Sequence, residues 1–173
     1  MATTLANLDL EIAHFDNFKR HIPGYSKLCE DTVESLLQLG ILQVSTAFEQ
    51  ALAKVGKHKV VSLDKGDLVR DGKFSDAKLS SVRTYSCGKS YGAPVTNVFN
   101  KTGSLRVQVY ELKQDKFYYF VIPRRAYIDI PKTSNIEIPF ALDGTPRRTP
   151  YRPVYVNWWN YEVDSFKELA NKG

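Results

Sequence analysis

The chain has 173 residues, of which 43% are hydrophobic and 25% are charged, and its formal net charge is +5. This composition excludes an intrinsically disordered chain, and the length predicts one domain that buries a core without disulfide staples. The positive charge favours a polyanionic partner.

The sequence carries none of the usual signals for targeting to a compartment or for binding a cofactor. The start MATTLANLDLEIAHF lacks a basic segment followed by an apolar run, and no apolar stretch approaches the ~20 residues that cross a bilayer, so we expect an intracellular, cytoplasmic protein. Cys29 and Cys87 are isolated, and the three histidines lack zinc spacing. A cysteine hydrolase that pairs Cys87 with His58 stays possible, but no spacing supports it.

Residues 1–56 are predicted to be helical. Steps of three and four separate the apolar positions Val33, Leu36, Leu37, Ile41, Val44, Phe48, Ala51, Leu52 and Val55. They indicate either one long helix or two helices joined near residues 40–45, ending at Gly56. Start signals lie at Asp31 with Glu34 and at Thr46 with Glu49. An earlier helix over 6–20 would end at Pro23-Gly24.

Residues 57–173 are predicted to form a sheet and a last helix. The β-rich runs are HKVVSL, DLVR, KFSDAKLSS, SLRVQVYEL, KFYYFVIP and, later, VYVNWW. Turn signals lie at 71–72, 88–92, 102–103 and 114–115, and a loop rich in proline and arginine spans 142–153. The segment DSFKELANK reads as a helix capped by Asp164. This order predicts a single α+β (or α/β) domain with a central mixed sheet flanked by helices.

Asp71-Gly72 fixes the register of one hairpin. A two-residue type I′ turn there pairs Arg70 with Lys73 and Val69 with Phe74, and it sets Asp67 opposite Asp76. Because side chains alternate along a strand, Lys78 shares the face of Asp76, and Val69 and Phe74 would mark that face as the core side. Two carboxylates opposite each other repel, and burial adds to the cost. A divalent cation between them would relieve the repulsion, and Mg²⁺ prefers such oxygen ligands.

Asp67, the Asp76-Ala77-Lys78 triplet and Glu49 on the preceding helix resemble the PD-(D/E)xK nuclease superfamily, which includes restriction endonucleases and small homing endonucleases. The resemblance covers residues 46–81 and implies a restriction-endonuclease-like fold. It implies that Asp67, Asp76, the Ala77 carbonyl and Glu49 hold Mg²⁺, with Mn²⁺ as a possible substitute. It also implies that Lys78 positions the nucleophile for phosphodiester hydrolysis, which leaves 5′-phosphate and 3′-hydroxyl ends.

Some positions depart from that pattern or leave alternatives open. Gly66 stands where the family name expects proline. Asp64 competes with Asp67 as the ligand, although the hairpin register favours Asp67. Glu49 is either a metal ligand or the end of a capping box that begins at Thr46. Glu34 is a weaker candidate for the metal ligand on the helix.

Basic residues just after the hairpin and in two later loops predict a surface for double-stranded DNA. The candidates are Arg83, Lys89, Arg124, Arg125, Arg147, Arg148 and Arg152. Ser80, Ser81 and Thr84 are further candidates for phosphate contacts. Because the chain has little room for a separate recognition domain, we expect a homodimer that makes a double-strand break.

Together these features predict a Mg²⁺-dependent, site-specific endonuclease of the restriction or homing type. Two alternatives remain. One is a repair or recombination nuclease of the same fold that recognises branched DNA. The other is a non-catalytic DNA-binding module whose hairpin acids are solvated. We expect Trp158, Trp159 and the aromatic run at 117–120 to be core residues rather than platforms for stacking bases.

Overall fold

The computed structural model describes residues 44–63, 65–85, 88, 90–99, 101–131, 135–149 and 156–173. The predicted helices before residue 44, together with Glu34, Asp64, Cys87, Lys89 and Arg152, lie outside the described residues. None of the helices in the described ranges is long and apolar enough to cross a membrane.

A six-stranded sheet forms the centre of the fold. Its strands are β1 (Lys59–Leu63), β2 (Gly66–Arg70), β3 (Lys73–Ser81), β6 (Ser104–Glu111), β7 (Lys116–Ile122) and β9 (Glu162–Val163), in the order β1-β2-β3-β6-β7-β9. Strands β3 and β6 are parallel, and the other neighbours are antiparallel. The predicted α+β fold with a mixed sheet is therefore confirmed.

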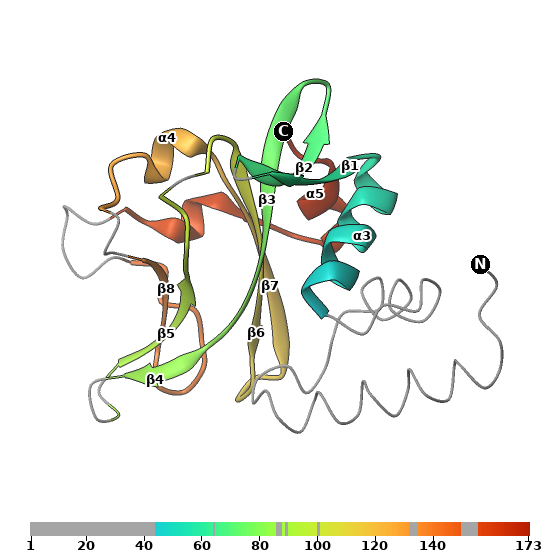
Figure 1. The fold of residues 1–173 in the computed structure, drawn as a ribbon. Coiled ribbons are helices and arrows are strands. Elements are labelled where there is room, and N and C mark those ends of the chain that lie inside the picture. Colours follow the sequence, from blue (N-terminus) through green and yellow to red (C-terminus); the bar gives the residue numbers. More distant parts are fainter. Residues whose placement is uncertain are drawn as a thin grey trace, which may run out of the picture.

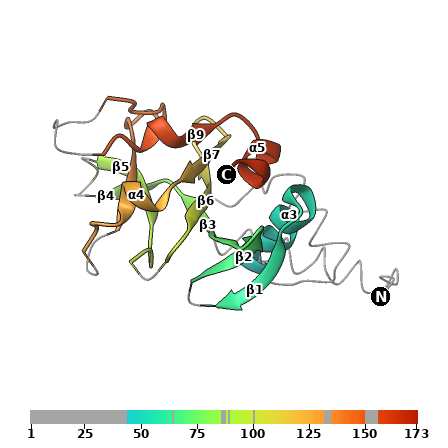
Figure 2. The same ribbon diagram turned by 90° about the horizontal axis from the view of Figure 1, so that it is seen from above.

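Two layers cover the opposite faces of this sheet (Figures 1 and 2). On one face, helices α3 (Val44–Gly56) and α5 (Phe166–Asn171) pack through Phe48, Leu52 and Leu169. On the other face lies a three-stranded sheet of β4 (Arg83–Tyr85), β5 (Ser90–Val95) and β8 (Ile136–Phe140). Its core includes Trp158 and Trp159, as the sequence predicts.

The hairpin between β2 and β3 has the predicted register. Arg70 pairs with Lys73, Val69 with Phe74 and Leu68 with Ser75. Asp71 and Gly72 have φ values of 51° and 74°, as a type I′ turn requires. The prediction of a single core side needs correction: Asp76, on the predicted side, is only 1% exposed and Val69 and Phe74 are half-buried, but Leu68, on the opposite face, is also fully buried, against α3 and α5.

Four further predictions need correction. The described part of VYVNWW holds a 3-10 helix, η2 (Trp158–Tyr161), because the Asn157 side chain accepts the Trp159 N–H and starts a helical turn. Ser165 rather than Asp164 caps α5, by accepting the Glu168 N–H. Gly92 lies inside β5 and not in a turn, paired with Pro139 of β8. The sequence pattern also missed β4, β5, β8 and the short helix α4 (Arg124–Tyr127).

Candidate active site

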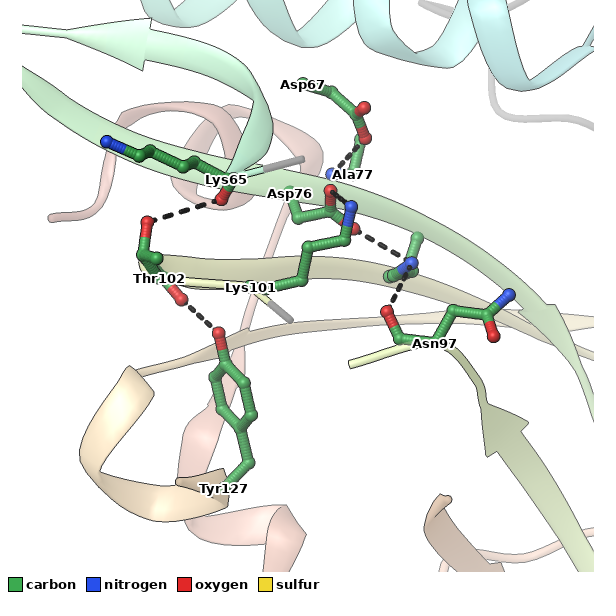
Figure 3. Close-up of polar contacts among 10 residues, drawn as sticks. Lys65, Asp67, Asp76, Ala77, Asn97, Lys101, Thr102 and Tyr127 are labelled. Atoms are coloured by element: carbon green, nitrogen blue, oxygen red, sulfur yellow. Dashed lines mark hydrogen bonds and ion pairs between the residues drawn. The ribbon is translucent and has the colours of Figure 1, made fainter. Parts of the chain in front are cut away.

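Asp76 is the centre of the candidate site. It lies on β3, in the interior of the large sheet, and its side chain is only 1% exposed. Lys78 Nζ lies 2.9 Å from its Oδ2 atom, and Lys101 Nζ lies 2.9 Å from its Oδ1 atom (Figure 3). Each carboxylate oxygen of Asp76 is therefore paired with one ammonium group.

Asp67 reaches the same place from β2. The regular pairing of β2 with β3 ends at Leu68 and Ser75, and the Asp67 Oδ2 atom accepts a hydrogen bond from the Ala77 N–H at 3.2 Å. Burial raises the pKa of Asp67, and the negative charge of Asp76 raises it further. The two predicted carboxylates are thus close enough to repel each other.

Glu49 is the third carboxylate of the group. Burial raises its pKa to about 7, and the charges of Asp67 and then Asp76 contribute to the rise. Helix α3 spans Val44–Gly56, so Thr46 lies inside it and is not the residue that starts the helix. A capping box from Thr46 to Glu49 is therefore wrong, and the position of Glu49 favours its assignment to the site.

Lys78 lies where the sequence predicts it, two residues after Asp76 on the same face of β3. Its side chain is 19% exposed, and its ammonium group also donates to the Asn97 carbonyl at 3.4 Å. Ser80, on the same face, donates to the Pro94 carbonyl of β5 at 2.6 Å. This face of β3 therefore points toward the smaller sheet.

Lys101 is a site residue that the sequence analysis missed. It belongs to the connection between β5 and β6, outside the motif, and no local pattern marks it. It reaches the site because β3 and β6 are parallel and Asp76 pairs with Leu105, at the start of β6. Residues just before β6 consequently lie beside Asp76.

The predicted DNA-binding arginines fall in different surroundings. Arg83 and Arg125 are exposed, and Arg147 is half-buried. Arg124 lies over the Tyr127 ring, 4.8 Å from its centroid, and the Tyr127 hydroxyl donates to the Gly103 carbonyl beside Lys101 (Figure 3). Arg148 pairs with Glu162 at 2.5 Å and lies over the Trp159 ring. The structure thus links α4 to the candidate site, while Arg148 already has protein partners.

The donor chemistry of the site suits a hard divalent cation. Carboxylates from α3, β2 and β3 act on one another electrostatically, and such groups bind Mg²⁺ through oxygen. Within the part of the chain that the structure describes, no three acidic, histidine or cysteine side chains stand around one point as a finished metal site. The ammonium groups of Lys78 and Lys101 lie against the Asp76 oxygens that a cation would use.

Comparisons with other proteins give no further guide: no protein-family model, no curated protein and no solved structure matches the chain.

Proposed function

We propose that this protein is a Mg²⁺-dependent endonuclease of the PD-(D/E)xK type that hydrolyses phosphodiester bonds in double-stranded DNA. The observation that carries the proposal is the buried Asp76, with Lys78 on the same strand and Asp67 and Glu49 coupled to it from β2 and α3. A buried acid paired with lysines, beside two half-buried acids whose pKa values are raised, is costly for a fold and is typical of active sites.

Each residue has a separate task in this proposal. Asp67 and Asp76 would hold Mg²⁺ together with the Ala77 carbonyl, and Glu49 would complete the ligand shell. When bound, the cation would polarise a phosphoryl oxygen and lower the pKa of a water molecule. Lys78 would orient the attacking water and stabilise the charge that develops on the phosphate. The water oxygen bonds to phosphorus and the P–O3′ bond breaks, which leaves 5′-phosphate and 3′-hydroxyl ends.

The proposed substrate is duplex DNA, cut by a homodimer. The net charge of +5 and the exposed Arg83 and Arg125 favour a polyanion. Arg124, placed beside the site through Tyr127, would contact a phosphate near the scissile bond. A two-fold dimer would present two such sites to a palindromic or nearly palindromic duplex.

Digestion of a genome-scale DNA in Mg²⁺, followed by mapping of the ends, tests this function. We expect discrete ends that recur at one sequence, carry 5′-phosphates and vanish with chelator. A second panel of linear, branched and mismatched duplexes separates the alternatives. Cutting of junctions alone would replace the site-specific enzyme by a structure-specific nuclease, and DNA binding with intact DNA in Mg²⁺ and Mn²⁺ would favour a non-catalytic binding module.

A further inference from the structure

The connection between β5 and β6 is fixed against the candidate site. The Thr102 N–H donates to the Lys65 carbonyl at 3.3 Å, and the Tyr127 hydroxyl donates to the Gly103 carbonyl (Figure 3). A Cβ atom on Gly103 would stand 1.7 Å from the Phe74 carbonyl oxygen, so only glycine allows this approach to the start of β3. These contacts hold both residues that follow Lys101.

The side chain of Lys101 is directed inward from this fixed connection. It is only 13% exposed, and its ammonium group ends on Oδ1 of Asp76. Holding a lysine in one orientation costs side-chain entropy, and burying its charge costs more unless a partner compensates. The compensating partner is Asp76, which already has Lys78 on its other oxygen.

An ammonium group and a divalent cation at the same carboxylate oxygen repel each other, so each weakens the binding of the other. When a cation takes its place on Asp76, the repulsion between the cation and the ammonium group favours moving that group to another anion close by. On a nucleic acid, that anion is a non-bridging phosphate oxygen.

We propose that Lys101 is a second cationic residue of the active site, which occupies Oδ1 of Asp76 in the free protein and transfers to a phosphate oxygen of the substrate when a divalent cation is held there. This inference rests on the proposed nuclease function for its phosphate partner. The competition between Lys101 and a divalent cation for Asp76 concerns the free protein, so it can be tested without any DNA.

The first experiment measures Mn²⁺ binding to the free, full-length protein by calorimetry. Lys101→Met removes the competing charge and keeps most of the side-chain volume, so we expect Mn²⁺ to bind about tenfold more tightly. Lys101→Arg keeps the charge and should stay close to the unaltered protein. Lys116→Met is the matched control, because Lys116 is exposed at the far end of the β6–β7 hairpin, opposite Glu111. Mn²⁺ affinity that does not rise in Lys101→Met, or no Mn²⁺ binding by any variant, would overturn the inference.

The second experiment measures binding of a DNA duplex in Ca²⁺ across a series of salt concentrations. Loss of one phosphate contact should lower the slope of log affinity against log salt by about one in Lys101→Met and leave Lys116→Met unchanged. An unchanged slope in Lys101→Met would overturn the transfer to phosphate. Circular dichroism verifies folding, and Lys101→Gln serves as a second neutral variant if Lys101→Met does not fold.

The outcomes for Lys101 and for the nuclease function are separable. Tighter Mn²⁺ binding by Lys101→Met, without DNA cleavage by the unaltered protein, would support the competition on Asp76 and reject the nuclease. DNA cleavage that depends on Asp76 and Lys78, with unchanged Mn²⁺ affinity and salt slope in Lys101→Met, would support the nuclease and reject the role of Lys101.

Discussion

Lys78 Nζ lies 2.9 Å from Oδ2 of Asp76, and both residues belong to the same face of β3. Because Lys101 pairs with the other oxygen, Asp76 separates two ammonium groups that would otherwise face each other. Asp76 is therefore the counter-ion of both lysines in the free protein, in addition to its role in the proposed chemistry. This dual role sets it apart from Asp67 and Glu49.

Neutralisation of Asp76 should destabilise the protein. Asp76→Asn leaves two mostly buried ammonium groups without their counter-ion, and breaking a buried pair costs about 3 kcal/mol. Urea unfolding in the presence of chelator measures the change in the free energy of unfolding. Combining Asp76→Asn with Lys101→Met should recover part of the loss, and a strictly additive double variant would contradict the direct pairing.

Neutralisation of Glu49 should have the opposite effect above neutral pH. Its pKa rises from an ordinary 4.5 to about 7 in the folded protein, so between these values the unfolded chain releases a proton that the folded chain keeps. Stability is therefore lost as pH rises through this window. Glu49→Gln should match the unaltered protein at about pH 4 and be more stable by about 1 kcal/mol at about pH 8, after allowance for solvent screening.

Thermal unfolding across this pH range, with chelator present, gives the comparison for Glu49→Gln. A difference between the two proteins that does not grow with pH would show that Glu49 is not held among the other carboxylates.

The two glycines that border β3 should respond differently to alanine. In Gly103→Ala the new Cβ meets the Phe74 backbone, so we expect a loss of about 3 kcal/mol. In Gly72→Ala the Cβ has open space, and only the φ of 74° is unfavourable, which costs about 1 kcal/mol. Denaturant unfolding of both variants measures the difference, and equal losses would mean that the β5–β6 connection does not approach β3 as described.

Two exposed arginines should differ in their effect on DNA binding. Arg125→Ala should lower the slope of log affinity against log salt by about one, because Arg125 lies on α4 next to the candidate site. Arg148→Ala should mainly lower stability, by about 1 kcal/mol, since Arg148 pairs with Glu162 and lies over Trp159. Salt titrations of duplex binding and urea unfolding separate the two effects, and a full-sized slope change in Arg148→Ala alone would reverse this assignment.

The hairpin could be predicted from the sequence because its determinants are local. Asp71-Gly72 alone fixes the turn and hence the pairing of Val69 with Phe74. The spacing of Asp76 and Lys78 then places both side chains on one face. The side of the sheet that faces the helices was not predictable in this way, because it depends on how α3 and α5 pack over Leu68.

Lys101 could not be predicted because its position depends on the parallel pairing of β3 with β6. Short antiparallel hairpins carry a turn signature, but a parallel neighbour has none in the local sequence. Strands β5 and β8 were missed for a similar reason. Pro94 and Pro139 interrupt their strand patterns, and the two strands form because β5 pairs with β8.

The cleavage rate of long duplex DNA under single-turnover conditions tests the central claim most directly. The unaltered protein and Lys116→Met should cut at the same rate in Mg²⁺, and the rate should fall by about a thousandfold or more in the double variant Asp76→Ala, Lys78→Ala. Circular dichroism confirms that the double variant is folded. Cleavage retained by that folded double variant would contradict the assignment of the active site to Asp76 and Lys78.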